Sequence, residues 1–196
     1  IIFGGVTDAE KIEAARAEMI NTGLYGPRLT CDHRDLSTIP YGSYLANLIV
    51  ADNESFTNVP TDVARHLKPL GGVLCLASSS KTDEFLAATK LADEKATITK
   101  QGDFTLLKRA ALPGAGDWSH QYGNAANTSS NNDQRIKGGL SVLWYGDPGP
   151  GKMVNRHNGA VGPIRVNGRL FIQGDTTVMA YDAYNGDLLW AVANPG

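Results

Sequence analysis

The sequence has little of what would assign it at once to a chemical or cellular class. It carries only two cysteines, Cys31 and Cys75, which are far apart and in no CxxC pair, so it offers neither a redox motif nor a thiolate metal site. The formal net charge is −2, and no basic field points to nucleic acid or an anionic membrane. No apolar run approaches the roughly 20 residues that cross a bilayer.

What is present is the composition of a folded protein. Hydrophobic residues make up 42% and charged residues 19% of 196 residues, enough for one domain or two small ones. The chain opens on the apolar run Ile1-Ile2-Phe3, which is typical of the middle of a strand. We therefore expect it to be a piece of a longer protein.

The first 112 residues alternate between strand and helix patterns. Ile1–Val6 and Leu45–Ala51 are predicted as buried strands, the second as a central parallel strand covered on both faces. Thr7 and Asp8 are residues typical of an N-cap, and Thr7 and Glu10 have the spacing of a capping box before a helix over 9–21. The other predictions are strands over 27–31 and 73–77, helices over 61–67 and 82–92, and a hairpin of 96–100 with 104–109. This order predicts an α/β fold with a mostly parallel sheet.

Four features in this half occur in an order that resembles a class I S-adenosylmethionine-dependent methyltransferase from its second strand onward. They are the helix Asp8–Met19, Asp35 with Ile39-Pro40-Tyr41, the turn Leu67-Lys68-Pro69-Leu70-Gly71-Gly72 before the strand Val73–Ala77, and the terminal hairpin. The resemblance covers about residues 1–110 and implies an incomplete Rossmann-like sheet without its first βα unit.

The cofactor residues that this family uses are largely missing. Its glycine-rich loop would precede Ile1, and its ribose-binding acidic position falls near Val6, which cannot accept those hydrogen bonds. The resemblance leaves Asp35 as the one candidate cofactor contact, at the adenine edge. The alternative interpretation makes Asp35 a turn-capping residue beside Ser37. The family's strand order also implies that Cys31 and Cys75 are separated, as two buried free thiols.

A composition break over 113–117 predicts a linker, and the pattern changes after it. We expect strands over 140–145, 164–166, 169–173, 178–182 and 187–191, with turns at Asn167-Gly168 and Asn185-Gly186. Four of these strands lie within about 30 residues, which is the size of one propeller blade. The predicted domains are therefore 1–112, the linker 113–117 and a β segment 118–196.

The stretch Ala180–Trp190 resembles the repeat of pyrroloquinoline-quinone (PQQ) dehydrogenase-like propellers, with Asn185 where that motif has threonine. Trp118 through Asn127-Thr128 is similar to the segment that leads into the first blade, and Arg156-His157 falls where related large exported bacterial proteins carry an Arg/His-rich segment. The resemblance implies an incomplete propeller. It also implies structural roles for five residues: Trp118, Asp182, Asn185, Gly186 and Trp190. Asn185-Gly186 is expected to adopt positive φ, and Asp182 to accept hydrogen bonds from the turn.

These observations predict an α/β, methyltransferase-like domain followed by an all-β, propeller-blade segment. The expected function is a non-catalytic scaffold or binding subunit of a larger exported protein, periplasmic or at the cell surface. Its partner would be another chain, or the remainder of the same protein, at exposed sheet edges. The alternatives are a methyltransferase whose cofactor loop lies outside this chain and a part of a PQQ-type quinoprotein dehydrogenase. No catalytic or metal residue is predicted, and His120 and His157 are expected to be structural or surface residues. S-adenosylmethionine or PQQ would bind only if the rest of the protein supplied the site.

Overall fold

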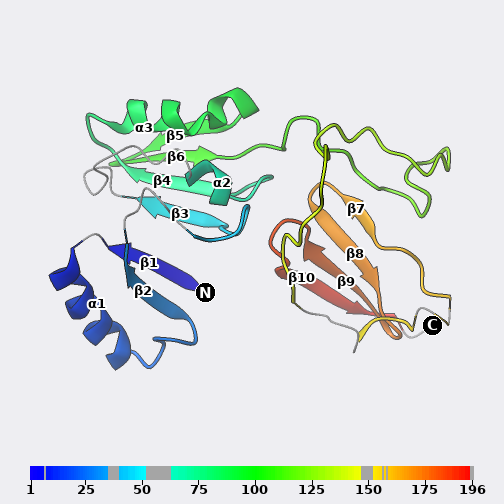
Figure 1. Ribbon diagram of the computed structural model, residues 1–196, viewed down its shortest axis with the longest axis horizontal. Helices are drawn as coiled ribbons and strands as arrows, with labels where there is room; N and C mark the ends of the chain where they lie inside the picture. The colour runs from blue at the N-terminus through cyan, green and yellow to red at the C-terminus, as the bar shows by residue number, and fades with distance from the viewer. Residues whose placement is uncertain are drawn as a thin grey trace.

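The computed structural model describes residues 1–6, 8–34, 40–51, 63–146, 152–155, 157 and 159–194 of the chain. Figure 1 shows a mixed α/β protein whose strands form three separate sheets. Two of them lie in the first half of the chain, and the third is formed by the four strands nearest the C-terminus. None of the helices in the described ranges is both long and apolar enough to cross a membrane.

The first sheet is a small parallel pair covered by one helix. β1 (Ile2–Val6) pairs with β2 (Leu29–His33), and α1 (Ala9–Asn21) packs against them. The predicted helix is confirmed, and so is Asp8 as an N-cap, since its carboxylate accepts the amides of Glu10 and Lys11. Thr7, the other predicted N-cap residue, lies outside the described residues. The prediction of a buried first strand is wrong, because β1 stands in a two-stranded sheet and Ile2 is 63% exposed.

The second sheet, called here the central sheet, has the strand order β3-β4-β6-β5. Its strands are β3 (Leu48–Ala51), β4 (Val73–Ala77), β5 (Thr97–Gln101) and β6 (Phe104–Lys108). Only β3 and β4 pair in parallel, so the prediction of a mostly parallel sheet is wrong for this one, whereas the β5–β6 hairpin is confirmed. The helices are α2 (Val63–His66), α3 (Thr82–Thr89) and the 3₁₀ helix η2 (Leu91–Glu94).

The helices α2, α3 and η2 cover one face of the central sheet. Leu74, Leu76 and Leu107 share this face and pack in one core with Val63 of α2 and Phe85 of α3. Alternation along β3 sends Leu48 and Val50 to the opposite face. Val50 is 67% exposed there, so the prediction that β3 is central and covered on both faces is wrong. An apolar strand sequence alone does not distinguish a central strand from an edge strand.

The third sheet is a four-stranded antiparallel meander in the order β10-β9-β8-β7. Its strands are β7 (Ile164–Val166), β8 (Arg169–Gln173), β9 (Thr177–Asp182) and β10 (Leu188–Ala193). The four predicted strands are confirmed within one or two residues at their ends. Asn167 and Gly168 both have positive φ, as a two-residue hairpin turn requires. The strand predicted over 140–145 is wrong, since these described residues form no strand.

The two cysteines are free and lie in different sheets. Cys31 in β2 is buried, as expected, whereas Cys75 in β4 is only half-buried. The side chain of Cys75 belongs to the face of the central sheet that carries Val50, its partner in the β3–β4 register. The lack of described cover on that face accounts for its partial exposure.

Candidate functional site

The turn between β9 and β10 docks on the loops that flank the central sheet. We call this contact the joint: on one side the turn Asp182–Asp187, and on the other the loop 44–47 and the turn 67–72. The turn is closed locally, because the Gly186 amide donates to the Asp182 carbonyl and the Tyr184 amide donates to Asp182 Oδ1. This confirms the turn-bonding role expected of Asp182, and it leaves Oδ2 directed at a partner from outside the turn.

That partner is Lys68. Its Nζ lies 2.6 Å from Asp182 Oδ2, and the two side chains are only 15% and 8% exposed. The Lys68 backbone is fixed by donation to Ala46 O and by accepting the Gly72 amide. A charged pair at this depth is held in an environment of low dielectric constant, where its attraction is stronger than at the surface. Lys68–Asp182 is therefore the electrostatic centre of the joint.

Amide groups extend the joint on one side of the ion pair. Asn47 Nδ2 donates to Asp187 Oδ2 at 2.7 Å, while Asn185 Nδ2 donates to Leu45 O at 3.1 Å and to Asn47 Oδ1 at 3.2 Å. Asn185 also accepts the Asp187 amide within its own turn. Asn185 thus bonds directly to the first half of the chain.

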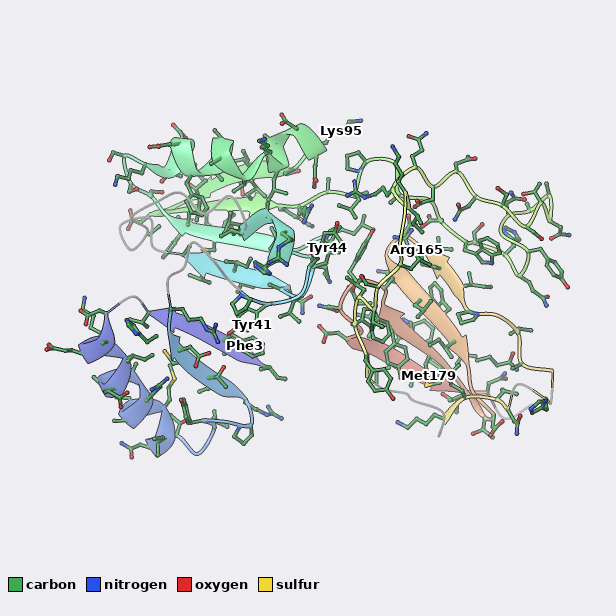
Figure 2. All side chains as sticks on the ribbon, in the orientation of Figure 1. Phe3, Tyr41, Tyr44, Lys95, Arg165 and Met179 are labelled. Carbon is green, nitrogen blue, oxygen red and sulfur yellow. The ribbon has the colours of Figure 1, made fainter. Side chains whose placement is uncertain are left out.

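Aromatic rings and guanidinium groups form the other side of the joint. The rings of Tyr44 and Tyr184 meet edge to face with centroids 5.5 Å apart. Arg109 lies over Tyr44 and Arg165 over Tyr184, and Figure 2 labels Tyr44 and Arg165 on the facing edges of the two halves. Arg165 Nη2 donates to the Tyr184 hydroxyl at 2.8 Å. Burial raises the pKa of Tyr184, although the nearby Arg165 opposes this rise.

The arginine on the central-sheet side is itself firmly held. Arg109 bonds to both carboxylate oxygens of Glu94 and donates from Nη1 to the carbonyls of Ala64 and Leu67, each at 2.6 Å. It therefore ties η2 and the end of α2 to β6 while presenting its guanidinium face to Tyr44. The joint is built on this rigid support.

Two glycines allow close packing at the joint. Gly186 has φ +77°, and a Cβ at this position would lie 2.5 Å from the Trp144 ring, whose Nε1 donates to Ala183 O at 3.1 Å. Gly168 in the β7–β8 turn meets the side chain of Leu70 from the turn 67–72. An L side chain at either glycine would combine an unfavourable φ with a steric clash.

The predicted site residues are only partly brought together. Asp182, Asn185 and Gly186 lie in the joint, but Asn185 does not have the expected positive φ, which is confined to Gly186 in this turn. Trp118 lies elsewhere, where it extends the meander through two backbone hydrogen bonds with Arg165. Trp190 is 41% exposed and packs on Phe171.

Other predicted features lie away from the joint or outside the description. Asp35 and Arg156 fall outside the described residues. His120 is exposed and contacts Ser119, while the His157 amide donates to Asn155 Oδ1. Within the described ranges, no group of three or more His, Cys, Asp or Glu side chains is placed to hold a metal ion.

Sequence reasoning missed the first-half side of the joint. The sequence places Lys68 in a turn motif without indicating a partner for it, and no motif includes Tyr44, Asn47 or Arg109. One signal was present in Asn47, a polar residue that interrupts the apolar run 45–51, because polar groups in such runs usually have a specific partner. The contacts of the joint are an ion pair, amide hydrogen bonds and a pair of rings that meet edge to face.

Comparisons with protein-family models, with curated proteins and with solved structures find no match to this chain.

Proposed function

We propose that this chain is a non-catalytic scaffold or binding segment in which another β-strand pairs with the edge of β10 that has no strand partner among the described residues. The observation that carries the proposal is β10 itself. It is the edge strand of the meander, all six of its residues are exposed, and none of them is charged. An edge of this kind is a template for a further strand, and proteins usually protect such an edge with charge, proline or cover.

The contacts of the joint also support this proposal. Asp182 and Asn185, two polar members of the propeller-like motif, are engaged with Lys68, Leu45 and Asn47. Their chemistry is used to fix the meander to the first half of the chain. The remaining surface of the meander is then free to present the β10 edge in a defined orientation.

The partner strand would come from another chain or from a further part of the same protein. The open face of the central sheet, with exposed Leu48 and Val50, offers a second apolar surface to such an assembly. By its resemblance to exported propeller proteins, we place the assembly in the periplasm or at the cell surface. No cofactor is part of this proposal.

Self-association tests the edge directly, because two copies of β10 can pair when no partner is present. Sedimentation velocity should show concentration-dependent dimers that weaken roughly tenfold, or ~1.4 kcal/mol, in Val192→Lys. Thr99→Lys is the matched control, since it places the same charge on β5, the exposed edge strand of the central sheet. Wild-type protein that stays monomeric, with the outward β10 amides protected from hydrogen exchange, would contradict the proposal.

Calorimetry with S-adenosylmethionine and reconstitution with PQQ test the non-catalytic part. We expect no saturable binding of the first and no bound chromophore with the second. Saturable S-adenosylmethionine binding that is lost in Asp35→Ala would instead support the methyltransferase alternative.

A further inference from the structure

A groove separate from the β10 edge and the joint combines positive charge with apolar side chains. Its volume is about 660 Å³, within the ~300–1,000 Å³ range of small-molecule sites. One wall comes from the first half of the chain, with Gly42, Ser43 and Arg65, and the other is the segment 135–143. The described lining holds three cationic side chains, Arg65, Arg135 and Lys137, and no carboxylate.

The segment 135–143 is anchored at its beginning. The Asp133 carboxylate accepts the amides of Gly116, Arg135 and Ile136 at 2.9 to 3.0 Å, which fixes the backbone that carries Arg135. Just beyond the other end, Trp144 donates to Ala183 O and packs on Gly186 in the joint. The segment is therefore a strap tied down at both ends, with its middle part lining the groove.

The middle of the strap has hydrogen-bond donors that the described protein does not use. From Lys137 to Leu143, no backbone amide donates a bond to another described residue. Within the described ranges, the side chain of Arg135 donates only to Pro113 O, and neither Arg135 nor Lys137 forms an ion pair. Positive side chains and free amides together favour an anionic ligand group.

Apolar side chains lie among these donors. Ile136, Leu140 and Val142 line the groove and are largely exposed, so a ligand with an apolar body would remove them from water. Arg65 completes the opposite wall, where its Nη1 is held by Tyr41 O at 2.9 Å. A ligand that bridged both walls would brace the strap against the first half of the chain.

We propose that this groove binds a small organic anion in which a phosphate, sulfate or carboxylate group is joined to an apolar body. The acidic group bonds to Arg135, Lys137 and the strap amides, and the apolar body covers Ile136, Leu140 and Val142. The proposal is independent of strand pairing at β10, since the groove contains no residue of the meander.

The probe for the test is 1-naphthyl phosphate, compared with inorganic phosphate and with 1-naphthol. Calorimetry should show saturable binding of 1-naphthyl phosphate that exceeds the binding of either fragment. Amide resonances of residues 137–143 should shift on its addition. Lys137→Gln and Arg135→Gln should each weaken binding about tenfold. Lys137 makes no described side-chain bond, so its variant is expected to fold normally.

Arg28→Gln is the matched control, because Arg28 is exposed, precedes β2 and lies outside the groove. It should leave binding unchanged. Undiminished binding by the Arg135→Gln/Lys137→Gln double variant would overturn the site. Equal binding of 1-naphthol would overturn the need for an anionic group, and equal binding of inorganic phosphate would overturn the need for an apolar body.

Discussion

Lys68 and Asp182 form a buried ion pair between two turns that lie 114 positions apart in the sequence. Lys68 belongs to the turn 67–72 beside the central sheet, and Asp182 belongs to the turn between β9 and β10. Each residue is also fixed by hydrogen bonds within its own loop, so the ion pair joins two preformed turns. The contact makes the two halves depend on each other for stability.

Removal of the Lys68 charge should destabilise the protein substantially. Lys68→Met leaves Asp182 buried without its partner, and we expect the free energy of unfolding to fall by about 3 kcal/mol. Urea denaturation measures this change. Lys11→Met, which removes an exposed lysine on α1, is the control and should have little effect.

A double-mutant cycle separates the ion pair from the rest of the joint. Asp182→Asn keeps an oxygen that can accept the Tyr184 amide but removes the charge. Lys68→Met/Asp182→Asn should therefore cost less than the sum of the single variants, by more than about 1 kcal/mol. Strict additivity would show that Lys68 and Asp182 are not coupled.

Local patterns predicted much of the fold because they act over a few residues. The helix over 9–21, the β5–β6 hairpin and the meander strands follow from periodicity and from turn residues such as Asn167-Gly168. The burial of β1 and β3 did not follow, since the number of strands in a sheet and the cover of its faces are decided by distant parts of the chain. The apolar residues over 140–145 form no strand for a related reason: Trp144 packs on Gly186 and donates to Ala183 O instead.

In the joint, too, contacts within one turn could be predicted from the sequence, whereas contacts between the two halves of the chain could not. The role of Asp182 within its turn was predictable, because an aspartate can accept the amide two residues later. Its pairing with Lys68, and that of Asn185 with Asn47, required the relative placement of the two halves. Neither resemblance supplies that placement, because each concerns one half alone.

The absence of a side chain at Gly186 should matter more than its positive φ. Gly186→Ala must strain the backbone and also displace the Trp144 ring, which a Cβ would meet at 2.5 Å. We expect a loss of about 1–2 kcal/mol from the left-handed conformation and about 2 kcal/mol more from overpacking. Thermal and urea unfolding measure the total, and near-UV circular dichroism reports the displaced indole.

Gly23→Ala is a matched control for Gly186→Ala. Gly23 has a similar φ of +70°, but a Cβ there would meet nothing within 4 Å. Its variant should show the backbone cost alone. Equal destabilisation by the two substitutions would mean that Trp144 readily moves away and does not constrain the turn.

Tyr184 should make the protein less stable in alkaline solution. Its pKa is raised by burial above the ordinary value of 10.0, so the neutral phenol is favoured in the folded state. The associated stability is fully present below pH 10 and is lost as the pH rises from there through the folded-state pKa. Tyr184→Phe should make the free energy of unfolding less dependent on pH above pH 10. At neutral pH it should lower that free energy by about 1 kcal/mol, because the hydrogen bond from Arg165 is lost. Tyr122→Phe, at an exposed ring, should keep the wild-type slope.

Asp133 should make the protein less stable in acidic solution. Hydrogen bonds from the amides of Gly116, Ile136 and Arg135 hold the pKa of Asp133 below its ordinary value of 3.8. The ionised carboxylate is favoured in the folded state, so this contribution is present above pH 3.8 and is lost as the pH falls from there through the folded-state pKa.

The contribution of Asp133 is measured by following the midpoint of urea unfolding as the pH falls from neutral to below 3.8. Asp133→Asn should lower stability at neutral pH and abolish this part of the acid dependence, whereas Asp103→Asn, at an exposed carboxylate in the β5–β6 turn, should keep it. Because Asp133 fixes the backbone of Arg135, Asp133→Asn should also weaken 1-naphthyl phosphate binding at neutral pH although it removes a negative charge. Tighter binding in this variant would show that Asp133 acts on the ligand by simple repulsion and does not position the strap.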